Sequence, residues 1–179
     1  MAAQPCPQLV SYEEFVRLAE TSPVKVELHF GQVIEMARPT PRHIEIQYRL
    51  QDLLRAVFGS AWAARIEMPY RAFPQFEARS ADVGVASNER WQAALKTDSL
   101  FGSPEIVIEI FSPKSNAAAE MAEKATLCLG TGALQFWVVD DRYSIVTVTT
   151  PDGRSVYGAG GTIPLGIAGA TIAVSDFFA

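Results

Sequence analysis

The hydrophobic and polar positions along the chain predict helices that alternate with strands. In residues 42–59 the apolar side chains recur every three or four positions, which is the spacing of an amphipathic helix. Residues 62–68 alternate between apolar and polar and predict a strand that ends at Pro69, and a second strand is expected at residues 81–86. Residues 105–111 are almost continuously apolar, which is typical of a strand covered on both faces. We therefore expect this strand at the centre of the sheet.

Shorter elements are predicted before this core. Ser11 and Glu14 have the spacing of a capping box, which predicts the start of a short helix. Residues 24–30 alternate between apolar and polar, and a second, mostly apolar run covers residues 33–36 after a break at Gly31. This arrangement predicts a hairpin.

The second half of the chain predicts a helix and further strands. Ser115 and Asn116 are expected to cap a helix over residues 117–129, because glycines follow it and most of its residues favour helix. Three more strands are expected at residues 134–139, 143–149 and 155–157. The glycine-rich residues 158–169 predict a surface loop with one short strand at most.

Together these elements predict an α/β fold in which helices flank a mixed sheet, with additional hairpins near both ends of the chain. A length of 179 residues is typical of one domain, so we expect a single domain over residues 1–179 in which residues 1–10 form a loose leader. Hydrophobic residues make up 49% of the chain and charged residues 20%, which excludes a disordered protein.

The charge narrows the classes of partner. The net charge is −5 and the isoelectric point is about 5.1, which argues against a broad basic surface for nucleic acid. Arginines could still line a local groove, and the candidates are Arg38, Arg42, Arg49, Arg65, Arg71 and Arg79. Cys6 and Cys128 have neither metal-ligand nor disulfide-framework spacing, which fits a cytoplasmic setting. The sequence predicts no signal peptide and no membrane span.

Asp82 and Glu109 interrupt two apolar strands with carboxylates. An ionised carboxylate in a covered strand costs several kcal/mol unless a cation or hydrogen bonds compensate it. Taken alone, Glu109 could form a salt bridge or lie at a solvent-exposed end of its strand. Asp82, taken alone, could be a turn or edge residue. Two such carboxylates in neighbouring strands favour an acidic site, and magnesium is the cation that such oxygen ligands suit.

Lys124 lies on the inward face of the predicted helix, because it shares helical spacing with Met121, Ala125 and Cys128. A lysine among inward residues is a candidate third member of the acidic site. The alternative is a lysine that extends its amine to solvent or pairs with Glu120 four residues earlier.

Several short blocks follow one another in a specific order along the chain. They are VEL (residues 26–28), GQVIEM (31–36), PTPRH (39–43), Asp82, PEIVIEIFSP (104–113), EK (123–124), Gly132 and FWVVD (136–140). In this order they resemble the Uma2 family of putative restriction endonucleases, which belongs to the PD-(D/E)xK nuclease superfamily. The resemblance extends from about residue 11 to residues 176–178.

This resemblance implies a restriction-endonuclease-like core and magnesium-dependent cleavage of phosphodiester bonds, with manganese as a possible substitute. It implies that Asp82, Glu109 and the backbone carbonyl of Ile110 hold the metal ion. Phe111 occupies the usual place of the superfamily's lysine, and the resemblance implies that Lys124 on the following helix replaces it.

The resemblance also implies roles for Glu27 and His43, which match family positions facing the same pocket. Glu27 would bind a second cation or position the first, and His43 would contact phosphate or assist proton transfer. Two positions depart from the family pattern, where Ala81 replaces a proline and Cys128 replaces a tyrosine. Neither departure removes a metal ligand.

The partner expected from this family is nucleic acid, with DNA as the first choice, and the expected assembly is a homodimer. A different class of function is a non-enzymatic binding or assembly protein that keeps the nuclease-like core. Its support is the acidic charge together with apolar residues in the C-terminal third that could cover a partner. These are Val146, Val148, Ile163, Leu165, Ile172, Phe177 and Phe178.

Overall fold

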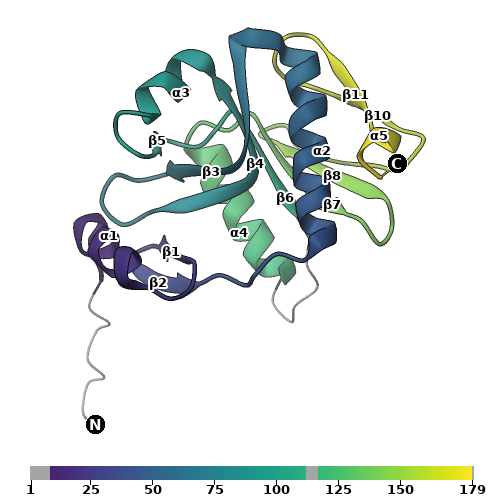
Figure 1. The fold of residues 1–179 in the computed structure, drawn as a ribbon. Coiled ribbons are helices and arrows are strands. Elements are labelled where there is room, and N and C mark those ends of the chain that lie inside the picture. The colour runs from purple at the N-terminus through teal and green to yellow at the C-terminus, as the bar shows by residue number, and fades with distance from the viewer. Residues whose placement is uncertain (1–8, 112–116, 179) are drawn as a thin grey trace.

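The computed structural model of the protein describes residues 9–111 and 117–178. Its helices are α1 (Tyr12–Thr21), α2 (Pro41–Phe58), α3 (Asn88–Ala94), α4 (Ala117–Gly130) and α5 (Ser175–Phe178), with a 3-10 turn at Gly59–Ala61. Its strands are β1 (Val26–His29), β2 (Gln32–Glu35), β3 (Trp62–Arg71), β4 (Arg79–Ser87), β5 (Leu100–Phe101), β6 (Ile106–Ile110), β7 (Gln135–Asp140), β8 (Ile145–Thr150), β9 (Gly153–Tyr157), β10 (Thr162–Pro164) and β11 (Thr171–Ala173). Figure 1 shows their arrangement.

A seven-stranded mixed sheet forms the centre of the fold, in the order β5-β3-β4-β6-β7-β8-β9. β6 pairs in parallel with β7 and antiparallel with β4, and it is the fourth of the seven strands. All five residues of β6 are buried. The apolar run around Glu109 is therefore the central strand, as its composition predicts.

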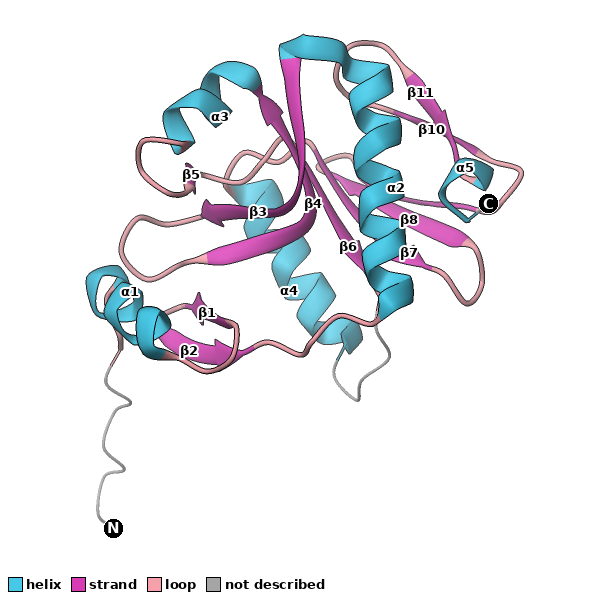
Figure 2. Ribbon diagram, viewed as in Figure 1, coloured by secondary structure: helices cyan, strands magenta, loops and turns pink. Residues whose placement is uncertain are grey.

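Helices cover both faces of this sheet (Figure 2). On one face, apolar residues of α2 pack with the β10–β11 hairpin and α5 against alternate side chains of the central strands. On the other face, α3 and α4 contribute Ala94 and Leu127 to a second cluster that contains Val107 and Phe136. This arrangement confirms the predicted fold class, including small hairpins near both ends of the chain.

Local capping explains where the first two helices begin. Ser11 and Glu14 form the predicted capping box at the start of α1. Thr40 caps α2, and Pro41 is the first helical residue, a position where the missing N–H of proline costs nothing. α2 ends at Gly59, whose φ of 60° lies in the left-handed region that glycine accepts.

The β1–β2 hairpin attaches the N-terminal part of the chain to the sheet. Leu28 forms an isolated bridge with Ala78 just before β4. The N–H of Val10 donates to the carbonyl of Gly31 at the tip of the hairpin, over 2.8 Å. The expectation of a loose leader is therefore wrong at Val10, and residues 1–8 lie outside the described part of the chain.

β3 does not end at Pro69, contrary to expectation, but continues to Arg71. Proline is tolerated on edge strands, and β3 has an open edge at Pro69 because β5 pairs only with Tyr70 and Arg71.

The hydrophobic pattern also missed α3, a seven-residue helix capped by Ser87. The predicted cap at residues 115–116 lies outside the described residues.

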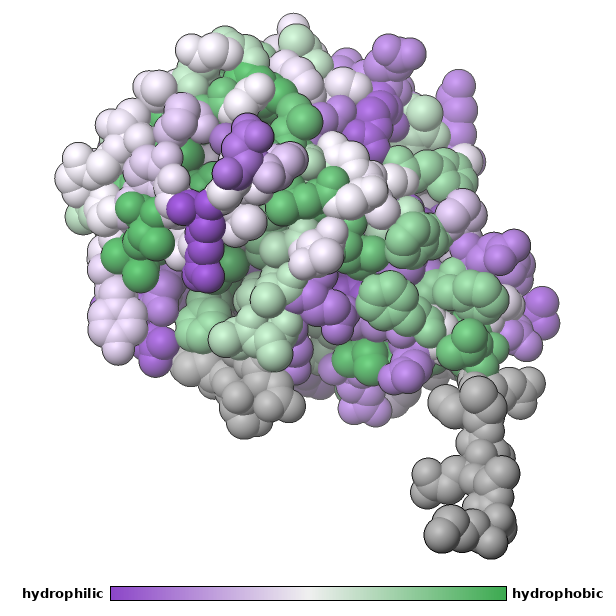
Figure 3. All heavy atoms as spheres, turned by 180° about the vertical axis from the view of Figure 1, so that it is seen from behind, coloured by the Kyte–Doolittle hydropathy of each residue, from purple (hydrophilic) through white to green (hydrophobic). Residues whose placement is uncertain are grey.

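The C-terminal apolar residues that we expected to cover a partner belong to this chain's own core. Val146, Val148, Ile163 and Phe177 are buried in the cluster that faces α2. On the face shown in Figure 3, apolar residues occur in several groups separated by polar ones. Of the two observations that favoured an assembly protein, the apolar residues are thereby removed, and the acidic charge stands. No helix in the described ranges is long and apolar enough to cross a membrane.

Candidate active site

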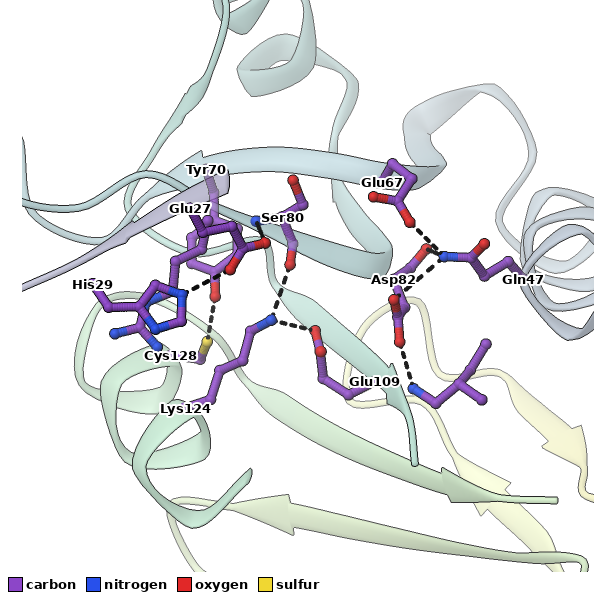
Figure 4. A network of polar contacts seen from close by, with 12 residues as sticks. Glu27, His29, Gln47, Glu67, Tyr70, Ser80, Asp82, Glu109, Lys124 and Cys128 are labelled. Carbon is purple, nitrogen blue, oxygen red and sulfur yellow. Dashed lines mark hydrogen bonds and ion pairs between the residues drawn. The ribbon is translucent and has the colours of Figure 1, made fainter. Parts of the chain in front are cut away.

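The predicted site residues line one cleft of about 420 Å³ between the β1–β2 hairpin, α2, the central strands and α4. Figure 4 shows the polar contacts inside it. All the side chains named by the sequence reach this cleft, namely Glu27, His43, Asp82, Glu109 and Lys124, and Ile110 also lines it. The cleft forms where β4 and β6 separate, because their pairing begins at Val83 and Ile108 and runs away from the site.

Asp82 is held from two sides. Its Oδ2 accepts a hydrogen bond of 2.7 Å from the backbone N–H of Ile110 on the neighbouring strand. Its Oδ1 lies 3.1 Å from Nε2 of His43 on α2. The carboxylate therefore bridges the gap between the two diverging strands, and Ile110 offers its backbone at the same point.

Glu109 faces α4, where Lys124 meets it. Nζ of Lys124 lies 2.9 Å from Oε1 of Glu109, and it donates over 2.9 Å to the backbone carbonyl of Ser80. Both side chains are more than nine-tenths buried. Oε1 of Glu109 is buried, and the ammonium of Lys124 is its close partner. A cation at this oxygen would share it with Lys124.

Burial and charge shift the pKa values of this pair upward. Burial raises the pKa of Glu109 to about 8, and the charge of Lys124 offsets only part of this effect. Burial alone would lower the pKa of Lys124, but Glu109 and Glu27 raise it well above its usual value. The amine is therefore charged near neutral pH, while the carboxyl group titrates close to the physiological range.

Glu27 approaches the site from β1. Its Oε1 accepts from the backbone N–H of Ser80 over 2.9 Å, and its Oε2 lies 2.8 Å from Nε2 of His29. Burial opposes ionisation, but the contacts with His29, Lys124 and Ser80 together lower the pKa of Glu27. Ser80 thus joins Glu27 and Lys124 through its two backbone groups, and Glu27 is a buried carboxylate beside the main pair.

His43 lies on the inward face of α2, as predicted, with 13% of its side chain exposed. Burial lowers the pKa of His43, but the hydrogen bond with Asp82 and the negative charges of Asp82, Glu67 and Glu109 together outweigh burial and raise it. His43 therefore gains positive charge beside the carboxylate of Asp82.

Two further residues of the site were not identified from the sequence. Gln47, one helical turn after His43, is buried and donates to Glu67 and Asp82. The sequence feature that could have identified Gln47 is its position as a polar residue next to the apolar stripe of α2. Glu67 gave no signal, because a polar residue at this position of an alternating strand normally faces solvent.

Glu67 marks an irregularity in the β3–β4 ladder. Its φ is 49°, in the left-handed region that non-glycine residues seldom adopt. Ile66 packs toward the cluster facing α2, whereas Met68 packs in the opposite cluster, although residues two apart in a regular strand share a face. Val83 and Ala81, their partners on β4, divide in the same way. In both strands, the side chains before and after this point therefore face opposite sides of the sheet. Asp82 lies between Ala81 and Val83, where the change occurs.

The expected arginine groove is not formed as a set. Of the six candidates, only Arg38 lines the cleft, where Lys25 also lies. Arg71 and Arg79 are buried, and Arg42 forms an ion pair with Asp141 over 2.7 Å. The fold directs these arginines to different surfaces.

The residues of the cleft fit a magnesium ion that is completed by water and substrate. Within residues 9–111 and 117–178, no three or more His, Cys, Asp or Glu side chains are gathered closely enough to form a full metal cage. Magnesium usually takes only one or two carboxylates and keeps several waters or phosphate oxygens. Asp82 and the buried Oε1 of Glu109 meet this requirement.

Glu109 should make the stability of the metal-free protein fall as the pH rises. Unfolded Glu109 loses its proton near pH 4.5, whereas folded Glu109 keeps it until about pH 8. Between these values the unfolded state binds fewer protons, so the free energy of unfolding decreases with rising pH. Urea unfolding with a chelator, from pH 5.5 to 8.5, should show a steeper decrease for the wild type than for Glu109→Gln. Parallel pH profiles of the two proteins would contradict this assignment.

Comparisons with known proteins show the family of the chain and a similar fold. The Uma2 family, described as "Putative restriction endonuclease", matches residues 12–175. The chain is also similar to the crystal structure of "a putative nuclease belonging to DUF820" from Anabaena variabilis, at 19% identity and a TM-score of 0.76, covering 94% of this chain and 97% of that one. A search of the curated proteins gave no match. Since the family match spans most of the sequence, this chain belongs to the Uma2 family.

Proposed function

We propose that this protein is a magnesium-dependent nuclease that hydrolyses phosphodiester bonds in DNA. The observation that supports this proposal is the convergence of Asp82, Glu109 and Lys124 in one cleft. The family match gives the reaction class, and the cleft supplies the groups that this reaction needs. A cation held by the two carboxylates and the carbonyl of Ile110 would polarise the phosphate and lower the pKa of a bound water.

Lys124 is the residue that we assign to the reacting phosphate. Its amine is charged and carries three hydrogens, of which two have acceptors in Glu109 and the carbonyl of Ser80. The third hydrogen is thus available to orient a water molecule or to stabilise charge that develops on the phosphate. Phe111, directly after β6, occupies the usual place of the superfamily's lysine, and Lys124 on α4 would take over its role.

The negative charge of the cleft supports a requirement for cations. Five carboxyl groups line it, from Glu27, Glu67, Asp82, Glu109 and Glu120. A phosphate would be repelled by those that are ionised, and the lysine and arginine side chains that oppose this repulsion among the described lining residues are Lys25, Arg38 and Lys124. We therefore expect both substrate binding and catalysis to depend on the metal ion.

Two acid variants test the proposed function. Purified wild type, Asp82→Asn and Glu109→Gln are incubated with supercoiled DNA, single-stranded DNA and RNA, with magnesium or manganese. We expect metal-dependent cleavage of DNA by the wild type and a loss of at least about 100-fold in each variant. Calorimetric titration with manganese should show weaker binding in both variants.

Asp152→Asn is the matched control, because Asp152 is an exposed residue of the turn between β8 and β9. It should cleave DNA like the wild type. Cleavage that persists in all variants would point to a contaminant and contradict the proposal. Absence of both cleavage and metal binding in the wild type would favour a binding protein that keeps the nuclease fold.

A further inference from the structure

Gln47 is a buried amide that lies between two carboxylates of the cleft, with 2% of its surface exposed. Its Nε2 lies 2.8 Å from Oε1 of Glu67, 3.3 Å from Oδ1 of Asp82 and 3.2 Å from the backbone carbonyl of Asp82 (Figure 4). All three of these oxygens are acceptors, so the amide must direct its NH2 group toward them. These three acceptors thus determine which end of the Gln47 amide faces Glu67 and Asp82.

We propose that Gln47 is a positioning residue that, held by Glu67, sets the orientation of Asp82 toward the cation. This inference rests on the proposed function, because it concerns the same metal site. It assigns to α2 a role beyond that of His43, since two residues one turn apart hold the same carboxylate.

The irregular ladder explains why Asp82 needs such a contact. The bridges between β3 and β4 include Ile66 with Val83 and Met68 with Ala81, but none joins Glu67 to Asp82 in the described pairing. Regular pairing with β3 therefore does not restrain Asp82. Gln47 contacts both its carbonyl and its carboxylate, and so restrains the backbone and the side chain together.

A neutral amide is well suited to this place. Glu67 and Asp82 would repel each other across the ladder, and the NH2 group of Gln47 donates to both of them without adding a full positive charge. A lysine here would compete with a metal ion for Asp82. Lys25 pairs with Oε2 of Glu67, whereas Gln47 donates to Oε1 of the same carboxylate.

A purely structural role for Gln47 makes a different prediction, and α2 contains a matched control. Gln51, one turn further along, is also buried, but its Nε2 donates to the backbone carbonyl of Ala64 over 3.3 Å. Gln47→Met and Gln51→Met remove the same amide from the same helix and keep a similar volume. Only the first removes a contact with Asp82.

The test is calorimetric titration of the wild type, Gln47→Met and Gln51→Met with manganese alone. We expect the dissociation constant to rise about 10- to 100-fold in Gln47→Met, which is typical when an outer partner of a metal ligand is lost. It should change less than about 2-fold in Gln51→Met. In the DNA cleavage assay, Gln47→Met should need more magnesium for half-maximal rate but keep most of its rate at saturating magnesium.

Glu67→Ala provides a second variant should Gln47→Met fold poorly, as judged by thermal unfolding without metal. It should weaken manganese binding in the same direction, and the double variant should be no weaker than Gln47→Met, because Glu67 acts through Gln47. No manganese binding by the wild type would overturn the proposed function. Binding by the wild type with unchanged constants in Gln47→Met or Glu67→Ala, or equal weakening in Gln51→Met, would overturn this inference alone.

Discussion

Replacing Arg79 with methionine should lower the free energy of unfolding by about 3–5 kcal/mol, because it leaves the buried Glu77 without its cation. Nε of Arg79 lies 2.7 Å from Oε2 of Glu77, and these side chains are 2% and 0% exposed. Oε1 of Glu77 accepts from the backbone N–H of Phe30 over 2.8 Å. The pair thus attaches the β1–β2 hairpin, which carries Glu27, to β4.

Urea unfolding of Arg79→Met checks this expectation, and two further variants make it specific. The double variant Glu77→Gln/Arg79→Met should recover much of the loss, since an uncharged amide can still accept from Phe30. Arg42→Met removes the exposed ion pair with Asp141 and should change stability little. Equal losses in Arg79→Met and Arg42→Met would show that burial does not decide the strength of these pairs.

Replacing Lys124 with methionine should reduce DNA cleavage by about 100- to 1,000-fold, the usual effect of losing one electrostatic contact to a transition state. Manganese binding should persist, because the lysine competes with a cation for Glu109 rather than binding it. This combination separates Lys124 from Asp82 and Glu109, whose loss should weaken both properties. Cleavage assays and calorimetric titration measure the two effects on the same preparation.

Lys96→Met is the control for the lysine, because Lys96 is exposed and follows α3. It should leave cleavage and metal binding unchanged. If Lys124→Met instead lost manganese binding, the lysine would be needed to build the carboxylate site. If it cleaved DNA at the wild-type rate, another group would have to act on the phosphate.

The central strand and the lysine helix were predicted from sequence because their signals are local. A carboxylate within the apolar run of β6 must be compensated, and a lysine with helical spacing to Met121 and Cys128 faces inward. Whether Glu109 and Lys124 meet depends on the packing of α4 on β6, which no local pattern contains. The family resemblance assigned both residues to one site, and in the structure Nζ of Lys124 lies 2.9 Å from Oε1 of Glu109.

Gln47, Glu67 and the buried pair of Arg79 with Glu77 were missed for a physical reason. Gln47 depends on partners on β3 and β4, and Glu67 depends on a reversal of strand alternation that its residue type does not signal. Glu77 and Arg79 are only two residues apart, but no local pattern shows that both of their side chains are buried. β3 looked shorter than it is for a different reason, since Pro69 was taken as the end of the strand, whereas its open edge tolerates a proline.

The assembly of the site from distant segments has a consequence for the newly synthesised chain. Glu27, Asp82, Glu109 and Lys124 come from β1, β4, β6 and α4, so the first and last are separated by almost a hundred positions. Contacts of such long sequence separation form late, because closing a long loop costs entropy before any contact repays it. A chain still emerging from the ribosome would therefore hold the acidic residues without the arrangement of the proposed metal site. The proposed nuclease activity would arise only once folding is complete.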